Sequence, residues 1–283
     1  MRPSRNGARG SLGSIAGFMF DLDGTLILSD PTLGSYKALP ESMEVLNELK
    51  RRGVPFVALT NGSAYPAIVQ APKLRAVGLP ISDDQLLTPS SVAADLMPRR
   101  GIKNALVLGT PGVGHALEEA GVRIFFTGQE GAERARAVYI GWHPNCGMKD
   151  IEAAANAIHN GAELYVASDV PYFITAAGKT MGISYAIAAA VRKMTRAPMI
   201  LTGKPSLHAL RLVSRKLGVP TRSVAVVGDD PLVEMIMARR GGAIGLGVTT
   251  GMTSAKGWAA QPLSKRPHKI LRQLSDVLRL AAG

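Results

Sequence analysis

The feature that most constrains the fold is a repeated alternation of short apolar runs with longer amphipathic segments. Several runs are almost wholly apolar, as expected for strands covered on both faces of a parallel sheet. The segments between them space apolar residues three or four apart, which indicates helices with one buried face. This alternation predicts an α/β protein with a doubly wound, mostly parallel sheet. The expected strands are Ile15–Phe20, Val54–Leu59, Ala105–Leu108, Val138–Ile140, Leu164–Ala167, Met199–Leu201, Val224–Val227 and Ala243–Leu246.

Composition narrows the class of protein. At 283 residues the chain is long enough for one large or two medium domains. Hydrophobic residues make up 46% and charged residues 19%, which excludes a disordered chain. The net charge of +12 is dispersed in small clusters, without an aromatic RNA-binding signature. We therefore expect attraction of phosphorylated substrates and no nucleic-acid partner.

The single cysteine and the apolar runs bear on location. Cys146 has no second cysteine to pair with, so a disulfide within the chain is excluded and no zinc–cysteine site is expected. A reducing, cytoplasmic setting fits this usage. Asp21 and Asp23 interrupt the first apolar stretch, which argues against a signal peptide. No uncharged run approaches the ~18 residues of a membrane span.

Two carboxylates follow the first predicted strand, in Phe20-Asp21-Leu22-Asp23-Gly24. Side chains two residues apart leave a strand on the same side, and the carboxyl ends of parallel strands border a ligand crevice. Neighbouring carboxylates repel each other unless a cation lies between them, so the pair indicates Mg²⁺. The simpler alternative is an Asx-turn that ends the strand.

Polar residues follow two further predicted strands. Thr60, Asn61 and Gly62 offer a hydroxyl and backbone N–H groups that can hold phosphate oxygens, although Asn-Gly is also a common turn. Lys204 offers a positive charge to a phosphoryl group, although a lone lysine is usually solvated.

An acidic turn follows the strand Val224–Val227. Asp229 and Glu234 could meet one metal ion, the first from the strand end and the second from a helical turn. Asp230 and Pro231 predict the start of that helix, with Asp230 as its N-cap. A second helix is expected at the C-terminus, with apolar residues spaced from Ile270 to Leu278.

In chain order, the four strand ends carry an acid pair, a hydroxyl, a lysine and an acid. This ordered set resembles the haloacid dehalogenase (HAD) superfamily of phosphatases. The resemblance implies that Asp21 is the nucleophile and that Asp23 is the general acid and base, with Mg²⁺ as the cofactor. It implies catalytic roles for Thr60 and Lys204 as well. The phosphate-binding residues are then Thr60, Asn61, Gly62 and Lys204, and the metal ligands are Asp21, Asp23 and Asp229.

The likeness extends to the NagD-like, p-nitrophenyl phosphatase branch of the superfamily (subfamily IIA). It rests on Gly203-Lys204-Pro205-Ser206, Gly228-Asp229, Thr249-Thr250-Gly251 and Asn160–Ala167. The branch implies a Rossmann-like core with an inserted α/β cap domain of type C2. We expect a flexible tail over 1–13, the core over 14–80 and 176–283, and the cap over 81–175.

Two residues depart from the branch. Glu234 stands where aspartate is usual, and Asp169 stands where asparagine is expected. We expect Glu234, Asp230 and Asp169 to support the site or to set its specificity. Whether Glu234 reaches the metal is left open.

Three other segments invite a functional interpretation. The spacing of Gly109–Gly114 is that of a P-loop, but His115 and Ala116 replace the required Lys and Ser/Thr, so a strand-to-helix turn is expected. Gly178-Lys179-Thr180 has a P-loop ending without the leading glycine, which is Phe173 here. His143 is expected either to face substrate or to be structural.

The favoured function is a Mg²⁺-dependent phosphomonoester hydrolase that acts through an aspartyl-phosphate on a small phosphorylated metabolite. A phosphotransferase or mutase on the same site is one alternative, which product analysis with added acceptors would distinguish. A binding protein with a degenerate site, using its basic surface on nucleic acid, is the other. The family also implies a homodimer through the cap. No cap residue selects one phosphate ester.

Overall fold

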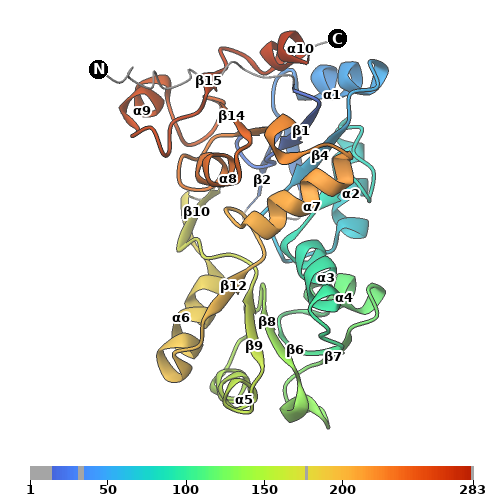
Figure 1. Cartoon of the computed structure of the whole chain (residues 1–283), viewed down its shortest axis with the longest axis vertical. Helices are drawn as coiled ribbons and strands as arrows, with labels where there is room; N and C mark the ends of the chain where they lie inside the picture. Colours follow the sequence, from blue (N-terminus) through green and yellow to red (C-terminus); the bar gives the residue numbers. More distant parts are fainter. Residues whose placement is uncertain (1–14, 31–34, 176–177, 282–283) are drawn as a thin grey trace, which may run out of the picture.

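The chain forms two α/β units stacked along the long axis of the molecule (Figure 1). The structure is a computed structural model that describes residues 15–30, 35–175 and 178–281, without the side chains of 173–179. The predicted tail over 1–13 lies outside the described residues. The α/β class with parallel sheets is confirmed. We call the upper unit of Figure 1 the core and the lower unit the cap.

The core is built on a six-stranded sheet in which every neighbouring pair of strands is parallel. The first strand of the chain lies inside this sheet, as its wholly apolar sequence predicts. In sheet order the strands are β15 (Lys269–Ile270), β14 (Ile244–Gly247), β13 (Val224–Gly228), β1 (Gly17–Phe20), β4 (Phe56–Leu59) and β5 (Leu86–Leu87).

Helices cover both faces of the core sheet. Strand β1 shows why, because Phe18 and Phe20 belong to one hydrophobic cluster and Met19 belongs to the other. Full burial of such a side chain contributes about 1.5–3 kcal/mol, so both faces need a cover. One face packs α1 (Ser42–Arg51), α2 (Ala67–Ala76) and α10 (Val277–Leu280), and the other packs α3 (Pro89–Arg99), α7 (Leu207–Leu217) and α8 (Glu234–Gly241). Helix α9 (Ala255–Ala260) buries Trp258, whose Nε1–H donates to the Val248 carbonyl at 2.8 Å.

The cap is built on a parallel five-stranded sheet. Its strands, in sheet order, are β12 (Met199–Leu201), β9 (Glu163–Val166), β8 (Ala137–Ile140), β6 (Asn104–Leu108) and β7 (Arg123–Phe125). Helices α5 (Met148–His159) and α6 (Ile183–Thr195) pack on one face, and α4 (Pro111–Glu119) packs with α3 on the other. Helix α3 also contacts α7, so it joins the cap to the core.

Two antiparallel hairpins and three short 3₁₀ turns complete the described elements. Strands β2 (Ile27–Ser29) and β3 (Tyr36–Ala38) follow the acid pair of β1 and form a hairpin that we call the flap. Strands β10 (Tyr172–Thr175) and β11 (Gly178–Met181) form the second hairpin, which lies between the two units in Figure 1. The 3₁₀ turns are η1 (Ala132–Arg134), η2 (Thr221–Ser223) and η3 (Leu274–Asp276).

Two strands pair across the boundaries expected for the cap. Strand β5 lies beyond residue 80 but pairs with β4 in the core sheet, and β12 lies beyond residue 176 but pairs with β9 in the cap sheet. A short apolar run does not indicate which sheet the strand will join, so the sequence did not assign β5 to the core or β12 to the cap. We propose that the cap spans about residues 100–202 and that the core takes the described remainder.

Two predicted helices differ from the structure. Helix α8 begins at Glu234, not after Asp230, because Asp230 Oδ1 accepts the Leu232 N–H at 2.7 Å in a turn. The expected helix from Ile270 to Leu278 is instead β15, η3 and α10, since Ile270 pairs with Gly247 at the sheet edge. No helix in the described part of the chain is long and apolar enough to cross a bilayer.

Candidate active site

The strand order of the core sheet brings the predicted residues together at the carboxyl ends of neighbouring strands. Strands β13, β1 and β4 are adjacent and parallel, so the residues after them share the carboxyl end of the sheet. These residues are Asp229, Asp21 and Thr60, and all three are buried. The Asp21 N–H donates to the Val227 carbonyl at 2.9 Å, which ties the end of β1 to β13.

Lys204 reaches this end of the sheet from the segment between β12 and α7. Its Nζ contacts Asp21 Oδ1 and lies 2.8 Å from Glu234 Oε1. Only 2% of Lys204 is exposed, so its ammonium group is held among carboxylates and away from solvent. Burial works against the charged form of Lys204, but the Asp21 and Glu234 charges outweigh it and raise its pKa. Lys204 therefore remains a cation.

Asn61 holds the backbone of Lys204. The Lys204 N–H donates to Asn61 Oδ1 at 2.7 Å, and Asn61 Nδ2 donates to the Lys204 carbonyl at 3.0 Å. A Cβ on Gly203 would lie 2.3 Å from the Ala167 carbonyl oxygen and 2.6 Å from Asn61 Oδ1, so this approach needs glycine. Both polar atoms of the Asn61 side chain thus contact the Lys204 backbone. The second N–H of Nδ2 is not used in these bonds, and phosphate binding by Asn61 stays a prediction.

Thr60 and Gly62 lie in the turn after β4. The Thr60 hydroxyl oxygen accepts the Gly62 N–H at 2.9 Å, and Thr60 N–H donates to the Leu87 carbonyl at 3.1 Å. The hydroxyl hydrogen of Thr60 is thereby left to point toward an acceptor in the site. This local turn is compatible with the predicted phosphate-binding role of Thr60.

Asp229 is fixed by a loop that follows β14. Its Oδ2 accepts the Met252 N–H at 2.7 Å. A Cβ on Gly251 would lie 1.9 Å from this oxygen, and a Cβ on Gly24 would lie 2.5 Å from it. The Thr250 hydroxyl donates to the Gly24 carbonyl at 2.6 Å, which ties the loop to the turn after Asp23. Glycines on both sides therefore let two loops close on Asp229.

Asp23 is positioned by the flap. Its Oδ1 accepts the Ser29 N–H at 3.1 Å and is also contacted by the Ser29 hydroxyl. Burial raises the pKa of Asp23, and the Asp21 charge adds to this, while the bonds from Ser29 oppose it. A carboxyl with a raised pKa is suited to give and take a proton. Ser29 was missed in the sequence because nothing in the short segment Ile27–Ser29 signals a hairpin.

Glu234 and Asp230 lie at the start of α8. Glu234 Oε1 contacts Lys204, and its Oε2 accepts the Asp230 N–H at 3.2 Å, so both of its oxygens have partners in the protein. A Cβ on Gly228 would lie 2.2 Å from Glu234 Cγ, so the side chain packs tightly against the end of β13. Glu234 therefore positions Lys204, which favours a supporting role over direct metal binding.

Asp169 lies apart from this cluster. It follows β9 and is exposed. Partial burial raises the pKa of Asp169, and the charge of Arg192 opposes this rise. By contrast, the Asp21 charge acts on the pKa of Asp23, Asp229, Asp230 and Glu234. A role of Asp169 in specificity stays a prediction.

The cluster carries an excess of negative charge. Asp21, Asp229 and Glu234 are buried around Lys204, the one buried Lys or Arg among the described residues. Burial raises the pKa values of Asp229 and Glu234, and the Asp21 charge adds to both, while Lys204 opposes. Clustered oxygen ligands with uncompensated charge suit a hard divalent cation such as Mg²⁺. The donor set therefore fits the expected metal, with Asp21 and Asp229 as its carboxylates.

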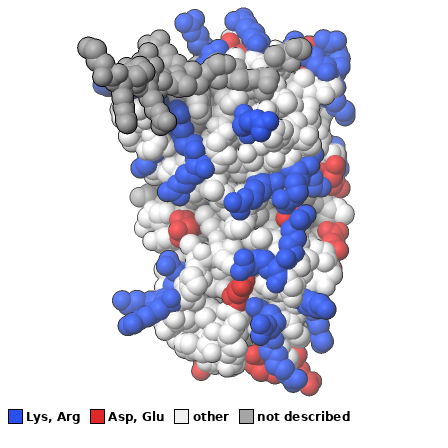
Figure 2. Space-filling model, in the orientation of Figure 1, with Lys and Arg blue, Asp and Glu red and all other residues white. Residues whose placement is uncertain are grey.

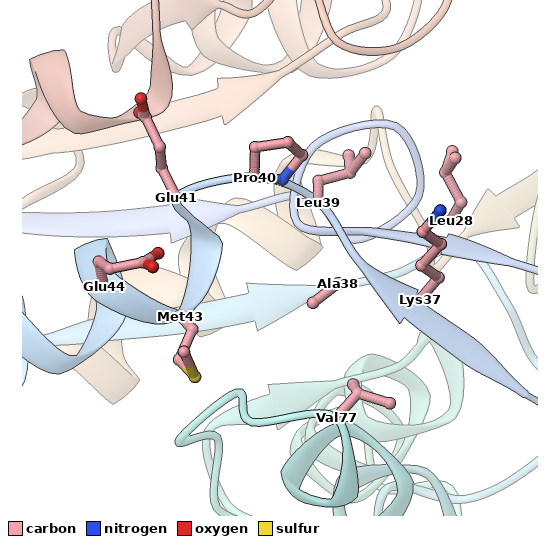
Figure 3. A pocket seen from close by; sticks show the side chains of 9 residues that line it. All are labelled: Leu28, Lys37, Ala38, Leu39, Pro40, Glu41, Met43, Glu44 and Val77. Atoms are coloured by element: carbon pink, nitrogen blue, oxygen red, sulfur yellow. The ribbon is translucent and has the colours of Figure 1, made fainter.

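The other segments singled out in the sequence lie elsewhere. The glycine-rich run after β6 is a strand-to-helix turn into α4, and a Cβ on Gly112 would lie 3.2 Å from the Ala64 carbonyl oxygen of the core. Gly178–Met181 forms strand β11. A pocket of 370 Å³ lies beside the flap and α1, lined by residues such as Leu28, Glu41 and Val77 (Figure 3). None of the predicted site residues lines that pocket.

Two family models and several known proteins match this chain. A family described as haloacid dehalogenase-like hydrolase matches residues 18–123, and a second described as HAD-hydrolase-like matches residues 201–277. The chain is 26% identical to the 5'-nucleotidase YutF of Bacillus subtilis, over 90% of this chain and 94% of that protein. It is 23% identical to the ribonucleotide monophosphatase NagD of Escherichia coli K12, over 93% and 98%.

A solved structure extends the likeness to the whole fold. The 4-nitrophenylphosphatase of Thermotoga maritima superposes with a TM-score of 0.83 at 25% identity, over 96% of this chain and 99% of that one. The two matched segments contain Asp21, Asp23, Thr60, Lys204 and Asp229, and the cap occupies most of the interval between them. The chain belongs to the haloacid dehalogenase-like hydrolases, with NagD-type phosphatases among its relatives.

Proposed function

We propose that this protein is a phosphomonoester hydrolase that acts through an aspartyl-phosphate on Asp21. The observation that carries the proposal is the contact between Lys204 Nζ and Asp21 Oδ1, which joins residues 183 positions apart in the chain. A buried carboxylate beside a buried ammonium is a nucleophile placed next to a group that can stabilise phosphoryl oxygens.

The proposed cofactor is Mg²⁺. Asp21, Asp229 and the main-chain carbonyl of Asp23 would hold it, as the excess negative charge of the cluster supports. When bound, the ion would neutralise charge on the substrate phosphate and orient it toward Asp21. Glu234 would act on the site through Lys204.

The first half of the reaction uses Asp21 and Asp23. A carboxylate oxygen of Asp21 forms a bond to phosphorus while the bond from phosphorus to the leaving oxygen breaks. Asp23, which is protonated at this stage, gives its proton to that leaving oxygen. The raised pKa of Asp23 supports this role, and Ser29 keeps the carboxyl turned to the site.

The second half releases phosphate. Asp23, now ionised, takes a proton from water, and the water oxygen attacks phosphorus while the bond to Asp21 breaks. Inorganic phosphate leaves and Asp21 is regenerated. Lys204 and Thr60 stabilise the phosphoryl oxygens in both halves, and Asn61 contributes by holding Lys204.

The proposed substrate is a small phosphate ester that enters between the cap and the core. YutF is named as a 5'-nucleotidase and NagD as a ribonucleotide monophosphatase, which makes nucleoside monophosphates the first esters to test. The visible face of the molecule carries many basic residues (Figure 2), which favours attraction of anionic substrates. A homodimer through the cap and a cytoplasmic location stay predictions.

The test is hydrolysis of p-nitrophenyl phosphate by purified Asp21→Asn protein with Mg²⁺. We expect activity to be lost while the protein stays folded, with a melting temperature above the temperature of the assay. Asp83→Asn is the matched control, because Asp83 is an exposed carboxylate paired with Arg75 at 2.8 Å. Activity of Asp21→Asn close to that of the wild type would refute the assignment of Asp21 as the nucleophile.

A further inference from the structure

A second group of metal-ligating side chains lies in the cap, at the carboxyl end of β8. His143, Cys146 and Asp150 each offer one ligand atom, and these atoms lie within 4.8 Å of one another. The His143 Nε2 atom is 3.4 Å from Asp150 Oδ2. All three residues are partly buried. The proposed phosphatase reaction uses none of them.

The backbone holds these ligands in place without a metal. The Cys146 N–H donates to the His143 carbonyl at 3.1 Å, so a tight turn brings the two side chains to the same end of α5. Asp150 lies in the first turn of that helix, and its Oδ2 accepts the Gly147 N–H at 2.8 Å. The loop is also tied to the turn between β6 and α4, since Thr110 N–H donates to the Trp142 carbonyl at 3.1 Å.

We propose that His143, Cys146 and Asp150 form a binding site for Zn²⁺, with solvent in the fourth position. Zinc takes nitrogen, thiolate and carboxylate ligands at about 2.0–2.3 Å in a tetrahedral arrangement, which sets a nitrogen-to-oxygen separation of about 3.3 Å. The observed 3.4 Å between His143 and Asp150 matches this separation. The thiolate then needs a shift of about 1 Å or less to join them.

The ligand chemistry separates this site from the catalytic cluster. Asp21 and Asp229 present oxygen only, which suits Mg²⁺, whereas a thiolate and an imidazole select a softer ion. The absence of a second cysteine argued against a zinc–cysteine site in the sequence. The proposal departs from that expectation, because a mixed ligand set needs only the one cysteine present.

The position of the site indicates what the ion would do. The turn at Thr110, which is tied to the β8–α5 loop, approaches the core at Ala64 and Pro66. The loop thus lies at the end of the cap that faces the core. Zinc there would fix the β8–α5 loop at the end of the cap that faces the core.

The simpler alternative is that no metal binds. Asp150 then caps α5 and accepts a hydrogen bond from His143. Cys146 packs against the cap, and its thiol donates to the Gly147 carbonyl at 3.9 Å. The two accounts differ over the thiol. A metal site needs the Cys146 thiolate as a ligand, whereas the capping account leaves it free to react.

The test is titration of the metal-free full-length protein with Co²⁺, followed by displacement with Zn²⁺. A thiolate-to-Co²⁺ charge-transfer band can arise only from Cys146, since it is the one cysteine of the chain. Cobalt bound at Asp21 and Asp229 gives no such band, so the readout is independent of the proposed phosphatase. We expect a band that saturates at one ion per chain, and Zn²⁺ to abolish it and to slow thiol modification at least tenfold.

Variants distinguish a built site from a thiol that binds metal alone. Cys146→Ser should abolish the band, and His143→Gln should weaken Zn²⁺ binding at least tenfold. His159→Gln is the control, because His159 lies exposed at the far end of the same helix. Asp150 also caps α5, so His143→Gln is the decisive variant. Absence of the band, or a band unchanged by His143→Gln, would overturn the proposal.

Discussion

Replacing Glu234 by glutamine tests the support of Lys204 most sharply. The substitution keeps the shape of the side chain but removes the charge that lies 2.8 Å from Lys204 Nζ. Glutamine has one acceptor oxygen and one NH₂ group, whereas Glu234 accepts from both Lys204 and the Asp230 N–H. One of these two donors must therefore face another donor in the variant.

The magnitude follows from burial. At 2.8 Å two unit charges attract by about 6 kcal/mol in an effective dielectric constant of about 20, and desolvation offsets much of this. Removing one partner of a buried pair costs about 3–5 kcal/mol. Burial raises the pKa of Glu234 to about 8, so the full charge is present only above that pH. There we expect about 3 kcal/mol for Glu234→Gln, because Asp21 remains as a second partner. For a chain of this size that is a fall of about 6–12 °C in melting temperature.

The assay is thermal unfolding of wild type, Glu234→Gln and a surface control, Glu133→Gln, together with kcat for p-nitrophenyl phosphate. Glu133 is exposed and pairs with Arg134 at 3.1 Å, so its loss should change the melting temperature by less than about 2 °C. Glu234→Gln should also lower kcat, since Lys204 is displaced from phosphoryl oxygens. A melting temperature and kcat equal to those of the wild type would refute the reasoning.

Three further predictions follow from the same contacts. Asn61→Ala removes two hydrogen bonds to the Lys204 backbone, so the free energy of unfolding measured in urea should fall by about 2 kcal/mol, and kcat should fall as well. An unchanged kcat would contradict the inference that Asn61 holds Lys204 in place. Gly251→Ala places a Cβ 1.9 Å from Asp229 Oδ2 and should lower activity at least tenfold, whereas Gly257→Ala in α9, with a closest approach of 3.2 Å, should not. Chelation with EDTA should abolish hydrolysis, and Mg²⁺ should restore it and raise the melting temperature, with about 2.7 kcal/mol of stabilisation at 100 times its Kd; full activity in EDTA would refute the metal requirement.

The fold class was readable in the sequence because buried parallel strands leave a local signal. The apolar runs ending at Phe20, Leu59 and Val227 became β1, β4 and β13, which are three adjacent inner strands of the core sheet. Polar residues directly after such runs must lie at one sheet edge, so the convergence of Asp21, Thr60 and Asp229 followed from topology alone. Lys204 was harder to place, since it follows a strand of the cap sheet.

The contacts within the site could not be predicted from the sequence, because they depend on how loops far apart in the chain lie against one another. Asn61 has the same sequence signal whether it faces phosphate or the Lys204 backbone. Glu234 showed its departure from the usual aspartate, but not that its longer side chain reaches Lys204. The sequence also did not show that β5 joins the core sheet and β12 the cap sheet, since both are apolar runs of two or three residues.

The central claim is that Asp21 carries the phosphoryl group during turnover. The direct measurement is acid quench of Asp23→Asn protein with p-nitrophenyl phosphate and Mg²⁺, followed by borohydride reduction and mass spectrometry of the peptide that contains Asp21. Nitrophenolate leaves without a proton from Asp23, while hydrolysis of the intermediate lacks its base, so the aspartyl-phosphate should accumulate and be reduced to homoserine at Asp21. Release of phosphate without any modification of Asp21 would contradict the account.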